Sequence, residues 1–287
     1  MMFNNSLRLK SSILFRSLSS KVVVVTSGKG GVGKTTTAAS FAYGLAEKGF
    51  NTVVIDFDIG LRNLDIHFGC ERRVIFDFVN VIQKECTLNQ ALIKDKRNPK
   101  LNILAASQTK DKTILTEEGV GRVLAELKEH FDYIICDSPA GIESGARHAM
   151  YFCDEAIICT NPELSSCRDS DKMIGFIASK SLRAINNDTP VVQRLLVTRY
   201  DPVRVQRGEC LSLDDIKDVL GIPVIGVIPE SPAVLTSTNM GQPVILQTSD
   251  NAAEAYRDCV KRFLGENVEL RFTQPEEKGF FSRLFGR

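Results

Sequence analysis

Residues 28–35, GKGGVGKT, constrain the fold of this chain more than any other feature. They follow a run of valines at 22–25 and precede a stretch, 38–46, whose alanines and leucine have helical spacing. The glycines allow backbone N–H groups to close around phosphate oxygens, and the following helix adds the positive end of its dipole. Lys34 is expected to reach the β- and γ-phosphates, and the Thr35 hydroxyl to hold Mg²⁺. The sequence therefore predicts a strand–loop–helix unit that binds a nucleoside triphosphate.

The rest of the chain repeats this alternation of strand and helix. Short apolar, mostly β-branched runs occur at 22–25, 52–55, 101–104, 133–136, 156–159, 195–198 and 223–228. Apolar strands that alternate with helices are typical of a mostly parallel twisted sheet with helices on both faces. We therefore expect an α/β fold of the P-loop NTPase class in one domain, residues 22–265. Ligands of such sheets bind at the carboxyl ends of the strands.

Composition excludes some classes of function and favours others. The formal net charge of +1 argues against nucleic-acid affinity along the whole chain, and no run of about eighteen apolar residues predicts a membrane span. The eight cysteines form no C-x-x-C pair, so we interpret them as reduced structural residues. An iron–sulfur or zinc site is the weaker interpretation.

Three aspartates follow strands on the expected ligand side. Asp137 ends the apolar run 131–136 and is expected to help hold the magnesium. Ser138 follows it, where many hydrolytic P-loop enzymes carry a glutamate that orients the attacking water. We favour Asp58 for that role and Asp56 as support for the Mg²⁺ shell, because both have the same strand parity. The alternative is that one or both aspartates cap the next segment.

The two ends differ from the middle. Residues 1–21 are rich in serine and basic residues, lack acidic ones and have an amphipathic pattern, which is the signature of an organellar transit peptide. The predicted location is the mitochondrion, in the matrix and peripheral on the inner membrane, with the plastid as the alternative. A disordered N-terminal tail is the other interpretation of this segment.

The C-terminal end predicts a membrane contact. Residues 266–277 have the polar composition of a linker, and residues 278–287 are expected to form an amphipathic helix. Its apolar face would carry Phe280, Phe281, Leu284 and Phe285, flanked by cations, as in helices that bind an anionic membrane surface. The alternative is a helix that docks on the core.

Five segments together resemble the deviant-Walker P-loop ATPases of the ParA/MinD family, and within it the MinD group of division-site ATPases. They are GKGGVGKT, VVIDFDIGLRNLD, CDSPAGIE, TNPELSSCRDSD and GQPVIL, and the similarity runs from Lys21 to Arg287. The resemblance implies a Mg²⁺-dependent ATPase, stimulated by partner and membrane, that is a homodimer when ATP is bound. It also implies MinC-like and MinE-like partners. The expected function is placement of an organelle division site.

The resemblance also implies roles for individual residues. Lys29 would be the signature lysine that contacts the phosphates of the other subunit, and Asp58 the switch acid. Arg62 and Asn63 would face that subunit, and Arg168, Asp169 and Asp171 would contact the protein partners. The nucleotide-binding set is Gly28, Lys29, Gly30, Gly31, Val32, Gly33, Lys34, Thr35, Thr36, Arg199, Pro229 and Glu230. The catalytic set is Lys29, Lys34 and Asp58, and the metal set is Thr35, Asp56 and Asp137.

Three other functions use a similar site. A ParA-like DNA-partitioning ATPase would bind DNA through a basic surface of the dimer, although no nucleic acid is expected for a chain of near-zero charge. An iron–sulfur carrier ATPase would need cysteine ligands, which the spacing disfavours. A scaffold that binds nucleotide without turnover is the third.

Overall fold

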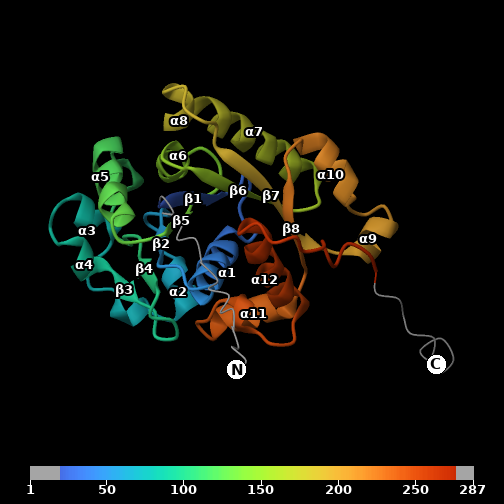
Figure 1. The fold of residues 1–287 in the computed structure, drawn as a ribbon, viewed down its shortest axis with the longest axis horizontal. Helices are drawn as coiled ribbons and strands as arrows, with labels where there is room; N and C mark the ends of the chain where they lie inside the picture. Colours follow the sequence, from blue (N-terminus) through green and yellow to red (C-terminus); the bar gives the residue numbers. More distant parts are fainter. Residues whose placement is uncertain (1–19, 276–287) are drawn as a thin grey trace, which may run out of the picture.

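The computed structural model describes residues 20–275. Their core is an eight-stranded sheet of order β3-β4-β2-β5-β1-β6-β7-β8, parallel throughout except that β3 runs antiparallel to β4 (Figure 1). The strands are β1 Lys21–Thr26, β2 Thr52–Asp56, β3 Ile93–Lys94, β4 Leu101–Leu104, β5 Tyr133–Asp137, β6 Glu155–Thr160, β7 Val192–Tyr200 and β8 Val224–Pro229. The predicted α/β class is confirmed, and each predicted strand is present.

The helices cover both faces of the sheet (Figure 1). They are α1 Lys34–Glu47, α2 Leu64–Phe68, α3 Phe78–Ile82, α4 Leu88–Ala91, α5 Glu117–Lys128, α6 Ser144–Tyr151, α7 Leu164–Lys180, α8 Leu182–Ile185, α9 Pro202–Gln206, α10 Leu213–Leu220, α11 Pro232–Asn239 and α12 Asn251–Phe263. Short 3₁₀ turns lie at η1 Glu71–Arg73, η2 Lys112–Ile114 and η3 Val244–Leu246.

Strand β1 shows why the apolar runs are continuous. Val22 and Val24 belong to the core under α5, α6 and α7, whereas Val23 and Val25 belong to the core under α1 and α12. All four side chains are fully buried, because both faces of a central parallel strand are covered. Burying each valine stabilises the fold by about 1.5–3 kcal/mol.

The strand register brings the polar motifs to one edge. Val25 of β1 pairs with Asp137 of β5, and Asp137 pairs with Asp56 of β2. The loop after β1 and the carboxylates at the ends of β2 and β5 therefore meet where the sheet order reverses, which is the expected ligand crevice.

The predicted N-terminal boundary overlaps the domain by one residue. Lys21 is the first residue of β1, its backbone N–H donates to the Asp132 carbonyl at 3.0 Å, and its ammonium pairs with the buried Glu155. The remaining predicted leader, apart from Ser20, lies outside the described residues. No helix within residues 20–275 is long and apolar enough to cross a membrane.

The first part of the predicted linker is attached to α12. The Arg262 guanidinium donates to the Val268 carbonyl at 2.8 Å, and Arg271 pairs with Asp258 at 2.7 Å and with Glu254 at 2.7 Å. Strand and helix are absent from this stretch up to residue 275. The predicted membrane helix, with Phe280, Phe281, Leu284 and Phe285, lies outside the described residues.

Candidate nucleotide site

The loop between β1 and α1 has the backbone of a phosphate cradle. Gly31 and Gly33 have φ of 75° and 86°, which disfavour any side chain. A Cβ added at Gly30, Gly31 or Gly33 would meet no described atom within 4 Å, so this face of the loop is open to a ligand. The open face and the α1 N-terminus fit the bound phosphates that the loop sequence predicts.

Gly28 has a different requirement. A Cβ there would come closer than 3.0 Å to the backbone of Asp169 in α7. The loop thus packs directly on the helix expected to contact protein partners. Replacing Gly28 by alanine is expected to push α7 away and to lower the free energy of unfolding by about 1–3 kcal/mol. Urea unfolding of Gly28→Ala measures this loss of stability, with Gly175→Ala, on the open side of α7, as the control. An unchanged unfolding midpoint in Gly28→Ala would contradict the close contact between Gly28 and Asp169.

Lys34 lies inside the loop. Its buried ammonium donates to the Ser27 hydroxyl at 2.9 Å and to the Lys29 carbonyl at 3.4 Å. Burial lowers its pKa, while the carboxylates of Asp137 and Asp58 oppose this effect. The side chain is therefore already held where a phosphate would replace neutral partners with charged ones.

Asp137, predicted to hold the metal, has a fully buried carboxylate. Burial raises its pKa well above the usual value, the charge of Asp56 raises it further, and a hydrogen bond from Thr35 opposes the shift. Its Oδ1 accepts no hydrogen bond from the described part of the chain. A carboxylate and a hydroxyl beside a phosphate cradle are the hard oxygen ligands that Mg²⁺ prefers, so these residues fit the ion.

Asp56 has a different part in this cluster. One of its oxygens accepts the N–H of Asp58 at 2.9 Å, and the other accepts those of Asn63 and Leu64 at 3.1 Å each. Burial raises its pKa to about 7. This geometry matches the capping alternative, because Asp56 shapes the loop that carries the half-buried Asp58. The predicted contact of Asp56 with the Mg²⁺ shell stays a prediction.

The Lys29 side chain points out of the phosphate loop, away from its own phosphate site. Its Nζ is 2.8 Å from Glu163 Oε2 and 3.4 Å from Ser165 Oγ, at the start of α7. The side chains of Lys29 and Glu163 are 42% and 50% exposed. The two lysines of the motif thus have different surroundings, one buried within the subunit and one at its surface.

The predicted interface residues occupy two elements beside the loop. Arg62, with φ of 47°, donates to Asp65 at 2.6 Å and to the Glu71 carbonyl at 3.2 Å, and Asn63 precedes α2 with an exposed side chain. On α7, Arg168 and Asp171 are exposed, while Asp169 pairs with Lys172 at 2.9 Å. The structure leaves their partner roles as predictions.

A pocket of about 370 Å³ opens beside the phosphate loop. It brings together the predicted base-contact residues Arg199, Pro229 and Glu230 with Val32, Gly33 and Thr36 of the loop and α1. The residues that sequence reasoning missed are Thr198, Ile228, Ser231, Val234, Leu235, Thr238 and Tyr256, which also line it. They are spread over β7, β8, α11 and α12, so no local motif marks them. Ser27 and Glu163, the partners of the two loop lysines, were also missed: Glu163 is distant in sequence, and Ser27, although adjacent to the loop, lies outside its motif.

Comparisons with known proteins agree with this site. A family model described as an AAA domain matches residues 20–189. The septum site-determining protein MinD of Escherichia coli K12 is 61% identical over 267 residues, which are 93% of this chain and 99% of that protein.

Two solved structures share the fold. A chain of the MinC:MinD cell division protein complex of Aquifex aeolicus has a TM-score of 0.78 at 38% identity, covering 88% of this chain and 99% of that one. MinD of Pyrococcus horikoshii, complexed with Mg-ADP, has a TM-score of 0.73 at 25% identity, covering 85% and 96%.

The predicted location is wrong. The septum site-determining relatives at about 60% identity are bacterial proteins, which points to a bacterial cytoplasm and membrane surface rather than to a mitochondrion or plastid. The predicted transit peptide and organelle role have no support from these relatives. The amphipathic composition that suggested them is a weak signal, because any short basic, serine-rich terminus shares it.

The activity follows from the family and the site together. P-loop enzymes bind nucleotide and Mg²⁺ and hydrolyse ATP with three features that this site has: a buried loop lysine, a Thr35–Asp137 pair and a phosphate cradle. The similarity to MinD covers nearly the whole chain. This chain belongs to the MinD family of septum site-determining P-loop ATPases.

Proposed function

We propose that this ATPase helps to place the division septum by switching between a free monomer and an ATP-bound, membrane-bound dimer. The names of its bacterial relatives and the MinC complex of its Aquifex relative support the division role. The observation that carries the dimer is the position of Lys29, which is exposed at the mouth of the loop and directed toward α7 instead of its own phosphate site.

Within one subunit, the residues have separable tasks. Lys34 holds the β- and γ-phosphates, and Thr35 and Asp137 hold the ion. A Mg²⁺ ion held there would neutralise charge on the phosphate oxygens. Asp58 orients the attacking water, because it lies in the same carboxylate cluster and Ser138 offers no carboxylate. Lys29 of the second subunit completes the site.

Protein partners would meet this site through α7. The Lys29–Glu163 ion pair lies at the start of the helix, and the backbone of Asp169 abuts Gly28. A MinC-like or MinE-like protein that contacts Arg168, Asp169 and Asp171 would therefore press on the element against which the phosphate loop rests. This contact gives a physical route by which a partner stimulates hydrolysis.

Membrane binding follows from avidity. A single helix with Phe280, Phe281, Leu284 and Phe285 on one face binds a bilayer weakly, whereas two in one dimer bind far more tightly through effective concentration. The contacts of Arg262 with Val268 and of Arg271 with Asp258 attach the first part of the preceding linker to α12.

Co-sedimentation with anionic vesicles tests this switch. We expect the protein to pellet with vesicles in ATP, to stay soluble in ADP, and to lose vesicle binding when residues 278–287 are deleted. The deletion should leave nucleotide binding unchanged, which a fluorescent-nucleotide titration checks. Equal binding in ATP and ADP would contradict the switch.

A further inference from the structure

His67 is a buried residue of the short helix α2, which follows the loop of Asp58, and its ring contacts the phosphate-loop helix α1. Its Nε2 is 3.4 Å from the Thr36 hydroxyl of α1, and its Nδ1 is 3.2 Å from the Asn63 carbonyl, just before α2. One ring therefore bridges the two elements that must keep a fixed separation around the nucleotide phosphates.

The two contacts define the tautomer of the ring. A carbonyl oxygen only accepts hydrogen bonds, so Nδ1 carries the proton and donates it to Asn63. Nε2 then has a free lone pair, which accepts the Thr36 hydroxyl proton. Burial lowers the pKa of His67, in keeping with a neutral ring.

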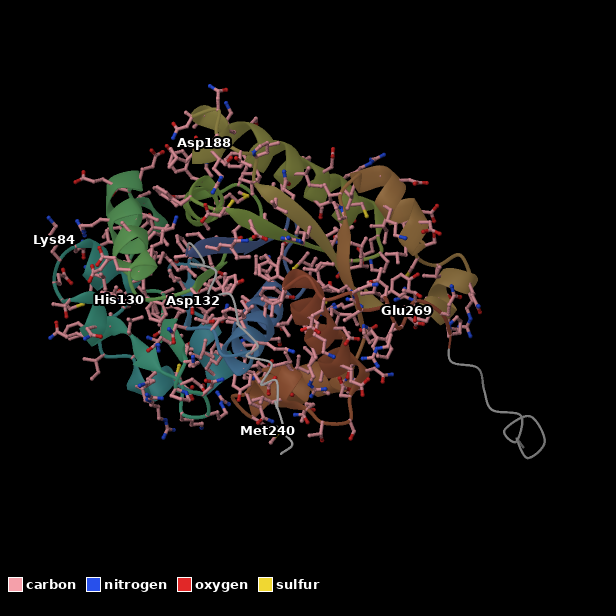
Figure 2. All side chains as sticks on the ribbon, viewed as in Figure 1. Lys84, His130, Asp132, Asp188, Met240 and Glu269 are labelled. Carbon is pink, nitrogen blue, oxygen red and sulfur yellow. The ribbon has the colours of Figure 1, made fainter. Side chains whose placement is uncertain are left out.

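The far end of α2 is fixed as well. The backbones of Gly69 and Gly241 touch, and Arg97 donates to the Phe68 and Gly241 carbonyls at 2.8 Å each. Gly241 follows α11, which lines the base pocket and ends near Met240 at the lower rim of the molecule (Figure 2). Helix α2 is thus held at its C-terminal end by the turn after the base-pocket helix, while the His67 side chain, from its last turn, reaches back to the Asn63 carbonyl and across to α1.

The loop that His67 holds carries the predicted water-orienting group. Asn63 donates its N–H to Asp56, and Asp58 lies between them in the chain. A shift of Asn63 would move this loop relative to Thr36, whose neighbour Thr35 contacts Asp137. Small errors of this kind lower turnover more than they lower affinity.

We propose that His67 is a positioning residue for ATP hydrolysis, which acts by tying the Asn63 carbonyl to the Thr36 hydroxyl. The inference concerns turnover at the ATP site and does not depend on membrane binding.

The test combines three single variants and one double variant with steady-state kinetics. His67→Leu, which removes both contacts, should lower kcat about three- to tenfold with KM and nucleotide Kd changed less than about twofold. Thr36→Val should lower kcat to a similar extent, and the double variant should be no worse than either single one. His67→Gln, which restores an acceptor for Thr36, should recover part of the loss.

A matched control isolates the bridge from a simple loss of a histidine. His148 in α6 makes the same local contact, from Nδ1 to the Ser144 carbonyl at 2.7 Å, and His148→Leu should leave kcat within about twofold. Unchanged kcat in His67→Leu, multiplied losses in the double variant, or no recovery in His67→Gln would each overturn the proposal. If His67→Leu does not fold, Thr36→Val, which removes only a hydroxyl, decides the question. A fall in kcat with little change in KM supports the proposal, and an unchanged kcat overturns it.

Discussion

Replacing Lys34 by alanine is expected to weaken nucleotide binding strongly and to lower kcat/KM for ATP by roughly 10²–10³-fold. Its ammonium is buried within the loop and faces the carboxylates of Asp137 and Asp58. Without it, the phosphates would lie beside the carboxylates of Asp137 and Asp58 with no neighbouring cation from the described residues of the same subunit, and like charge would oppose binding. The loss therefore begins with affinity and extends to dimerisation and membrane recruitment.

Lys29→Ala provides the contrast to this variant. Because Lys29 lies at the surface and pairs with Glu163, its removal should leave nucleotide affinity within about threefold while hydrolysis falls roughly 10²-fold. Fluorescent-nucleotide titration and phosphate release measure the two quantities separately. Equal loss of nucleotide affinity in both variants would show that Lys29 acts within its own subunit.

Replacing Asp137 by asparagine is expected to remove Mg²⁺-dependent hydrolysis and, at the same time, to stabilise the nucleotide-free protein near pH 8. Loss of the ion's buried carboxylate should lower kcat by roughly 10²-fold. The same change removes one negative charge from a buried cluster that also contains Asp56 and Asp58. Activity and stability should therefore change in opposite directions.

The pH dependence follows from the two raised pKa values. Folding raises the pKa of Asp56 to about 7 and that of Asp137 well above its usual value. Between the unfolded value, about 3.9, and these folded values, the folded chain binds more protons than the unfolded one. The free energy of unfolding should thus decrease as pH rises from about 4 through 7 and beyond.

Urea unfolding of the nucleotide-free protein between pH 5 and 8 checks this expectation. The slope with pH should be shallower in Asp137→Asn than in the unmodified chain. Asp132→Asn, just before the opposite end of β5, is a suitable control, because the half-buried Asp132 side chain accepts the Asn51 N–H and lies away from the buried carboxylate cluster. A slope that is the same in Asp137→Asn and the unmodified chain would contradict the buried-charge account.

The sequence predicts the strands and the phosphate loop well, for physical reasons. Val22–Val25 had to be buried on both faces, and Gly31 and Gly33 have the positive φ that a phosphate cradle requires. Strand β3 was missed because a strand of two residues is too short to show the alternation of apolar and polar residues that predicts a strand. The localisation failed because a terminal composition says little about the cell.

The remainder of the site depends on packing between distant segments. Strand parity predicts that Asp56 and Asp58 lie on the same side, yet Asp56 accepts hydrogen bonds from backbone amides of a loop whose course no local pattern predicts. Glu163 meets Lys29 across 134 residues of chain, and His67 meets Thr36 across 31. Such contacts become visible only when the fold brings α1, α2 and α7 together.

The mass of the protein in saturating ATP tests the central claim most directly. Sedimentation equilibrium under conditions that block hydrolysis should give a dimer in ATP, a monomer in ADP, and a monomer for Lys29→Ala in either nucleotide. Lys48→Ala is the matched control, because Lys48 pairs with Glu266 at similar exposures of 40% and 50% but lies at the end of α1. It should dimerise like the unmodified chain. A monomer in ATP, or a Lys29→Ala dimer as tight as the unmodified one, would contradict the account.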